Sequence, residues 1–462
     1  MNGSQIEMGQ RCAYRSKISN DKIETINFYN RKLCANVISE VIEHREFNDS
    51  EQSRNGGVLM FEFIKIYRGL PRNVYTLFLI QLINRLGDFV VPFLAMYLIY
   101  KLQFDSKTAS ILVTCVVLLQ VPGSLLGGVI SDSWSRKGTY VLSQTVSGLC
   151  IFTCVLTNNK TAIIALLFVS AFFSASVKPT VNTMLYDFLP PNKRKIGQSL
   201  LYLGVNLGVS IGILFAGFMF NHYLKLFFFC DALTSFLAVS LVVFNIKDEE
   251  PRHLKVTSEN PSSFMKELKS NYRITFFLGI YLVYSFIYAQ NSFSLPLMLN
   301  SIFIGSGPTY FGYLMSINGI TVIALTAGIT YLTRKTSSLI NITLGGVLYA
   351  VGFGMLGFSR HLPLFIVSTV LWTVGEILNS TNFGVYLANN SNEGMRGRYS
   401  SLMFICYSLG RAIGILSMGG YISRFGINAV WSIIMLIGSL ASCMTLFMYY
   451  VQSKKEALSK TA

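Results

Sequence analysis

Gly127-Gly128-Val129-Ile130-Ser131-Asp132-Ser133-Trp134-Ser135-Arg136-Lys137 joins two apolar runs, 108–131 and 139–157. Each run holds about 20 residues, which an α-helix needs to cross a hydrocarbon core about 30 Å thick. Glycines at the end of the first run let a neighbouring helix approach closely. An acid and two basic residues follow in the turn. The stretch therefore predicts a tight polar turn between two membrane-spanning helices.

Apolar runs of this length recur along the chain of 462 residues, which is 52% hydrophobic and only 13% charged. A soluble domain carries about 25% charged residues. Backbone groups in lipid need partners within the same segment, so the runs are expected to be helices. We therefore predict an all-α membrane protein with twelve transmembrane helices. They are expected at roughly 75–100, 108–131, 139–157, 162–187, 195–220, 224–246, 275–299, 308–333, 338–358, 363–388, 398–422 and 428–451.

A polar stretch at 247–273 separates the first six runs from the last six. The order predicts two pseudo-symmetric six-helix bundles, 60–246 and 274–462, joined by a linker. The segments Arg194 to Gly217 and Arg396 to Gly419 align without a gap. Self-similarity between the two halves of a chain indicates a repeated architecture. Parallel six-helix repeats with a binding site between them are typical of transporters.

Loop charges predict the orientation in the membrane, because cytoplasmic loops are enriched in Lys and Arg. With Met60 inside, inner segments carry about 21 Lys and Arg and outer loops about six. We expect a multi-pass protein of the cell membrane with both termini in the cytoplasm. The net charge of +16 is spread over short loops rather than gathered in one patch. This distribution argues against a nucleic-acid partner.

Residues 1–59 form a polar extension that contains no apolar segment of a signal peptide. The sequence Asn55-Gly56-Gly57-Val58-Leu59-Met60 can be encoded by a ribosome-binding sequence followed by a start codon. We therefore hypothesise that translation starts at Met60 and that residues 1–59 are absent from the native protein. A polar cytoplasmic tail is the alternative.

Metal and nucleotide sites are not expected. The eight cysteines form no CxxC pair, and the four histidines are scattered. The chain contains no phosphate-binding loop of the form GxxxxGK(S/T), so an ion gradient is the expected energy source. No cofactor is predicted. Catalytic His, Asp or Ser clusters of a membrane enzyme are absent, so the chain is not predicted to be an enzyme.

The turn at 127–137 closely resembles the loop signature of the major facilitator superfamily, G-x-L-A-D-R-x-G-R-K. Gly128, Asp132, Arg136 and Lys137 match it, whereas Ser133 and Ser135 replace its Arg and Gly. The resemblance implies a twelve-helix secondary transporter that works by alternating access. It also implies that Asp132 and Arg136 form an ion pair that gates the halves.

Further motifs resemble those of bacterial drug exporters in this superfamily. Asn84-Arg85-Leu86-Gly87-Asp88 is similar to their first helix, and Asp187 with Arg194 is similar to their junction between helices four and five. The resemblance implies a gating role for Asp187 and Arg194. Gly208-x3-Gly212-Ile213 resembles the antiporter signature, with Ile213 in place of its proline. The first, fourth, seventh and tenth helices are expected to line the cavity.

Five ionisable residues stand within predicted membrane helices: Arg85, Asp88, Lys178, Glu376 and Arg411. Such residues are functional candidates, because an unpaired charge in the bilayer is costly. Asp88 or Glu376 can carry protons between the two sides. Alternatively, Asp88 with Arg85 or Lys178, and Glu376 with Arg411, are neutralising pairs. Asp187 and Asp231 lie nearer helix ends and are expected at gates or interfaces.

Polar and aromatic residues near these charges complete the predicted substrate cavity, which suits an amphipathic organic molecule. The cavity candidates are Asn84, Arg85, Lys178, Asn206, Tyr284, Tyr288, Asn291, Asn379 and Arg411. Three embedded cations against two acids disfavour a purely cationic substrate.

We therefore expect proton-coupled export of a small organic compound by a monomer in the lipid bilayer. Proton-coupled uptake of an anionic or peptide-like nutrient is an alternative. A non-transporting receptor is another, although the 247–273 linker and the short C-terminus offer no signalling domain.

Overall fold

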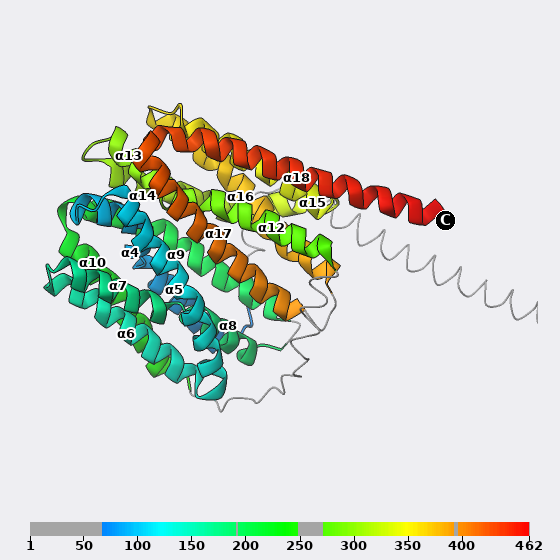
Figure 1. The fold of residues 1–462 in the computed structure, drawn as a ribbon. Coiled ribbons are helices and arrows are strands. Elements are labelled where there is room, and N and C mark those ends of the chain that lie inside the picture. Colours follow the sequence, from blue (N-terminus) through cyan, green and yellow to red (C-terminus); the bar gives the residue numbers. More distant parts are fainter. Residues whose placement is uncertain (1–66, 191–192, 248–270, 392–395, 462) are drawn as a thin grey trace, which may run out of the picture. The chain divides into compact units, whose positions relative to one another are not determined.

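The computed structural model describes residues 67–190, 193–247, 271–391 and 396–461. The predicted start at Met60, the extension 1–59 and most of the linker 247–273 lie outside the described residues. Residues Leu70–Ala462 form one compact unit (Figure 1). No strand occurs in the described ranges, and twelve helical spans are long and apolar enough to cross a membrane. The predicted fold class is therefore confirmed.

The first six spans contain nine helical segments, because the first and fourth spans are interrupted. The segments are α3 (Arg72–Leu86), α4 (Val90–Met96), the π-helical turn η1 (Tyr97–Lys101), α5 (Ser106–Ser133), α6 (Arg136–Leu156), α7 (Lys160–Ser174), α8 (Val177–Phe188), α9 (Arg194–His222) and α10 (Leu224–Asn245). Side chains of Asp105, Ser135 and Asn159 cap α5, α6 and α7 by accepting backbone N–H hydrogen bonds. Such caps satisfy amides that a helix leaves free at its start.

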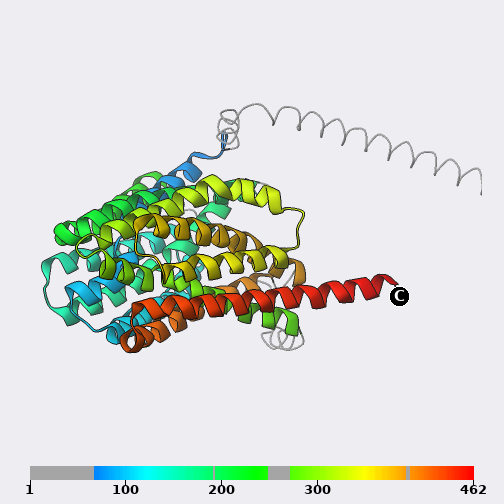
Figure 2. The same ribbon diagram turned by 90° about the horizontal axis from the view of Figure 1, so that it is seen from above.

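The last six spans repeat this pattern, with an interruption in the seventh. They are α12 (Tyr272–Tyr288), the short 3-10 turn η3 (Ala289–Asn291), α13 (Ser294–Ile302), α14 (Gly307–Thr333), α15 (Ser338–Leu356), α16 (Leu362–Asn390), α17 (Arg396–Phe425) and α18 (Ile427–Thr461). Figure 2 shows the C-terminal part of α18 projecting past the neighbouring helices.

Prolines explain the three interruptions. Pro92, Pro179 and Pro296 each lack the N–H that would bond to the carbonyl four residues earlier. Those carbonyls belong to Asp88, Ala175 and Ser292, and each lies at a break between two helical segments. The breaks therefore fall in spans one, four and seven, three of the four spans expected to line the cavity.

Matching glycines bring the interrupted spans close to their neighbours. A Cβ on Gly212 of α9 would lie 2.5 Å from the Leu86 carbonyl oxygen of α3. A Cβ on Gly414 of α17 would lie 2.7 Å from the Phe286 carbonyl oxygen of α12. Small residues allow such close packing in membranes. The aligned segments of the sequence repeat thus make equivalent contacts in the two halves.

Hydrogen bonds connect the two halves from the middle of the spans to the side opposite the start of α3 and the end of α18. Ser316 Oγ donates to the Ser210 carbonyl at 2.5 Å, and Thr114 Oγ1 donates to the Ala412 carbonyl at 3.3 Å. Further towards that side, Asn221 Nδ2 donates to the Gly305 carbonyl at 2.6 Å. The halves are therefore joined on this side of the membrane.

Candidate functional site

A cavity of about 350 Å³ lies between the two halves and is lined by charged side chains. The first half contributes Asn84, Arg85, Asp88, Lys178 and Asp231, and the second half contributes Phe404, Tyr407 and Arg411. The structure thus brings together five of the residues singled out in the sequence: Asn84, Arg85, Asp88, Lys178 and Arg411. Spans one, four, six and eleven supply these charges.

The break in the first span carries most of the charge. Arg85, at the end of α3, forms an ion pair with Asp88 in the break. Asp231 of α10 accepts hydrogen bonds from the backbone amides of Phe89 and Val90, each at 3.2 Å. One carboxylate oxygen therefore satisfies two amides at the start of α4.

Asp231 was expected at a gate or interface, and the structure places it between α10 and the start of α4, where it also lines the cavity. The sequence did not predict its place in the cavity, because that depends on how α10 crosses the first span at its break. Gly87 packs so tightly against Thr234 of α10 that a Cβ there would overlap the threonine side chain. Two features of the sequence could have indicated this contact. Asp231 stands within the apolar run 224–246, and the first span contains Gly87-Asp88 followed by Pro92.

An amide network supports the same wall of the cavity. Gln144 Nε2 of α6 donates to Asn84 Oδ1 at 2.7 Å and to Ser235 Oγ at 2.8 Å. These bonds tie α3, α6 and α10 together beside Arg85. Asn84 is therefore held in place by the protein while it lines the cavity.

Lys178 and Arg411 lack acidic partners among the residues that the structure describes. Lys178 lies in the first turn of α8 and forms no hydrogen bond there. Arg411 of α17 donates to Ser292 Oγ at 3.4 Å, and its guanidinium lies 5.6 Å from the Tyr407 ring centroid. Its Nε is buried without a hydrogen-bond partner.

Glu376 lies apart from these cations. Tyr288 OH donates to its Oε1 at 2.8 Å, and Asn318 Nδ2 donates to its Oε2 at 2.9 Å. Asn318 also donates to Thr373 Oγ1 at 2.9 Å. The neutralising pair of Glu376 with Arg411, one of the two alternatives from the sequence, is therefore not formed, since the described groups that bind this carboxylate are neutral. Asn318 was missed because its helix, α14, was not expected to line the cavity.

The other predicted cavity residues do not line this cavity. Tyr284 is buried and shares hydrogen bonds with Ser442 and Thr445 of α18, at 3.5 and 3.4 Å. Asn379 is buried against Gly345 of α15. The Tyr284 hydroxyl is therefore used within the second half, whereas the side-chain amide of Asn379 is buried without a hydrogen-bond partner among the described residues. Asn206 donates to the Tyr202 carbonyl at 2.8 Å, and Asn291 lies in the η3 break.

The gating residues make contacts that differ from the implied ones. Arg136 forms an ion pair with Asp187 of α8, not with Asp132. Asp132 is exposed at the end of α5, because the turn directs Arg136 towards α8. Lys137 Nζ donates to the Val243 carbonyl at 2.9 Å, and Arg194 Nη2 donates to the Tyr186 carbonyl at 3.1 Å.

The two glycines before the turn, Gly127 and Gly128, differ in how closely the neighbouring helix packs against them. A Cβ on Gly127 would collide with Ser176 of the fourth span, whereas a Cβ on Gly128 would meet nothing within 4 Å. Close packing at this point therefore requires Gly127, although Gly128 is the residue that matches the signature.

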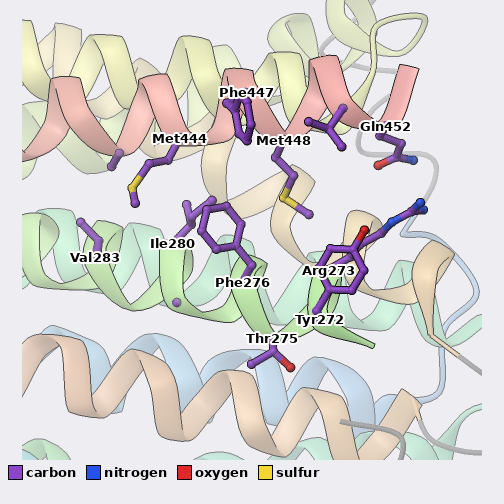
Figure 3. Close-up of a pocket in the computed structure, with 13 residues that line it drawn as sticks. Tyr272, Arg273, Thr275, Phe276, Ile280, Val283, Met444, Phe447, Met448 and Gln452 are labelled. Carbon is purple, nitrogen blue, oxygen red and sulfur yellow. The ribbon is translucent and has the colours of Figure 1, made fainter. Parts of the chain in front are cut away.

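A second hollow of about 860 Å³ lies between α12 and α18. Figure 3 shows Phe276, Met444, Phe447 and Met448 along it, with Arg273 towards one end. No acidic residue lines it. Its apolar walls suit lipid chains, so the charged cavity between the halves remains the candidate transport site.

Comparison with known proteins agrees with this architecture. Relatives include an uncharacterized MFS-type transporter, YqjV, of Bacillus subtilis, 23% identical over 73% of this chain and 82% of that protein. A Na(+), Li(+), K(+)/H(+) antiporter of Planococcus maritimus is 22% identical over 79% of this chain and 93% of its own length. The 4-hydroxybenzoate transporter PcaK of Pseudomonas aeruginosa is 24% identical over 79% of this chain and 86% of its own length.

Among solved structures, the nucleoside transporter NupG superposes with a TM-score of 0.70 at 14% identity, over 81% of this chain and 99% of that one. A likeness at this identity shows a shared fold. The family model described as Major Facilitator Superfamily matches residues 77–415. This chain therefore belongs to the major facilitator superfamily and is a membrane transporter, not an enzyme.

Proposed function

We propose that this transporter couples the export of a small organic compound to protons by alternating access. The carrying observation is the environment of Glu376, whose hydrogen-bond donors among the described residues are the neutral groups of Tyr288 and Asn318. A carboxylate held this way can take up a proton without leaving a partner cation unpaired. Asp88 is the second candidate, and it forms an ion pair with Arg85.

Alternating access is supported by where the halves meet. The described hydrogen bonds between them, such as Asn221 to Gly305, lie towards the side opposite the termini. With the termini in the cytoplasm, as the loop charges predict, this arrangement is closed towards the outside. We propose that protonation and substrate release accompany the opening of these contacts.

Purified protein in proteoliposomes with an internal pH-sensitive dye tests the coupling. A pH gradient is imposed, a panel of drug-like and nutrient-like compounds is added, and substrate-dependent proton movement is recorded. We expect Glu376→Gln to abolish this movement and Asp88→Asn to reduce it. Asp105→Asn changes an exposed acid outside the spans and serves as the matched control. Proton movement that persists in both Glu376→Gln and Asp88→Asn contradicts the assignment.

A second candidate function, proton-coupled uptake of an organic anion, is favoured by Lys178 and Arg411, which lack acidic partners in the described part of the chain. The same proteoliposomes distinguish the two directions. In export the compound and protons move in opposite directions, whereas in uptake they enter the same compartment together.

A further inference from the structure

The charged cavity holds more cations than its own acids can balance. Its lining includes Arg85, Lys178 and Arg411, against Asp88 and Asp231. Asp88 already pairs with Arg85, and Asp231 accepts two backbone amides. Glu376 is bound by Tyr288 and Asn318 and does not line this cavity. Lys178 and Arg411 therefore remain without a counter-charge in the part of the chain that is described.

Two further observations indicate that these cations are left for a ligand. Each charge is within a membrane span, where an uncompensated charge is unfavourable. Arg411 Nε is buried and unsatisfied, so the guanidinium has spare donor capacity. Ser292 Oγ, its described hydrogen-bond acceptor, is neutral and distant at 3.4 Å.

We propose that the cavity binds a small organic anion whose carboxylate is held between Lys178 and Arg411. The body of the anion packs against Phe404 and Tyr407, which line the same cavity. A volume of about 350 Å³ suits a molecule with one aromatic ring. This inference rests on the proposed transport function and holds for either direction of transport.

The placement of the two cations links binding to conformational change. Lys178 belongs to the first half and Arg411 to the second, so a bound carboxylate bridges the halves. Lys178 also lies in the first turn after the break at Ala175 and Ser176, where the fourth span is interrupted. A change in the angle between the halves therefore separates the two cations and weakens the anion's hold.

Binding to the purified full chain in detergent tests the proposal, with calorimetry as the readout. The probes are benzoate, phenylacetate and phenyl phosphate, with benzamide and benzylamine as neutral and cationic analogues. We expect at least one anion to bind about tenfold or more tighter than benzamide. Lys178→Gln and Arg411→Gln each lower its affinity by about tenfold, as expected for loss of one charge-assisted contact. Benzamide binding stays within about twofold.

Matched controls exist on the same spans. Lys160→Gln lies in the fourth span and Arg424→Gln in α17, and both residues are exposed at span ends. These variants are expected to bind the anion as the wild type does. The proposal is overturned if none of the three anions binds the wild type, or if the cavity variants retain full affinity.

The outcome is separable from that of the proton assay. Proton movement with an uncharged compound, without anion binding, refutes the anion site and leaves proton coupling intact. Anion binding that depends on Lys178 and Arg411, without proton movement, supports the site and refutes the coupling.

Discussion

The first and seventh spans break at equivalent places but are held by different chemistry. In the first span, Arg85 pairs with Asp88, and Asp231 caps α4. In the seventh span, Ser294 Oγ donates to Gln290 Oε1 at 2.6 Å, and Gln290 Nε2 donates to the Phe286 carbonyl at 3.1 Å. The first break carries its own charged side chains, whereas the side chains of the second break are neutral and receive a hydrogen bond from Arg411 of α17 at 3.4 Å.

The difference separates architecture from chemistry. Proline positions and glycine contacts set the two breaks and are shared by both halves. Charges at the break are confined to the first half, and the second half places its membrane acid, Glu376, on α16 instead. Substitutions at the shared glycine contacts should therefore lower stability equally in the two halves. Substitutions of the polar groups at the breaks should lower stability by different amounts in the two halves.

The largest expected effect comes from the shared glycines. Gly212→Val and Gly414→Val each force a side chain against a backbone carbonyl of the neighbouring span. We expect both to lower the free energy of unfolding by about 3 kcal/mol. Thermal unfolding in detergent measures this effect. Gly420→Val, on α17 with open space at its Cβ, is the control and should remain close to wild type. Unequal losses for the two variants would refute the equivalence of the halves.

A smaller, asymmetric effect is expected at the breaks. Asp231→Ala leaves the Phe89 and Val90 amides without their acceptor, and we expect a loss of about 2 kcal/mol, because each unsatisfied amide costs at least about 1 kcal/mol. Gln290→Ala removes bonds that remain within its own span and should cost about 1 kcal/mol. Thermal unfolding compares the two.

The variant Asp231→Asn distinguishes the role of the Asp231 oxygen as a hydrogen-bond acceptor for α4 from the role of its negative charge. Its amide oxygen still accepts hydrogen bonds, so stability should lie near that of the wild type. A loss as large as that of Asp231→Ala would mean that the negative charge, not the acceptor, holds α4.

The number and extent of the spans followed from the sequence because hydrophobic length is a local property. Twelve apolar runs predicted the twelve spans, and the aligned glycines of the repeat occupy equivalent contacts. The breaks were not predicted: continuous helices were expected at 75–100, 162–187 and 275–299, and the structure interrupts all three. A proline alone is not a sufficient signal, because Pro122 lies inside the uninterrupted helix α5.

Partners of the buried charges could not be predicted with the same success. Arg85 with Asp88 is close in sequence, and one of the two alternatives for Asp88 named that pair. Arg136 with Asp187 joins two helices, and Asp231 reaches α4 from α10. Such contacts depend on how the helices cross. The sequence of either helix alone does not contain that information.

The smallest effect concerns the entry to the second and eighth spans, which continue the contrast between the halves. Asp105 caps α5 by accepting the Lys107 and Thr108 amides at 3.1 Å, whereas Ser306 before α14 makes no such side-chain bond. Hydrogen bonds from Thr108, side chain and then backbone, lower the pKa of Asp105 below its ordinary 3.8. A lowered pKa in the folded protein contributes stability above the unfolded pKa, and this contribution is lost as the pH falls through the folded value.

We therefore expect Asp105→Ala to lower the unfolding temperature slightly at neutral pH, and Ser306→Ala to leave it unchanged. The Asp105 difference should shrink below about pH 3.8. An equal difference at all pH values would show that the hydrogen bonds favour neither charge state of the cap.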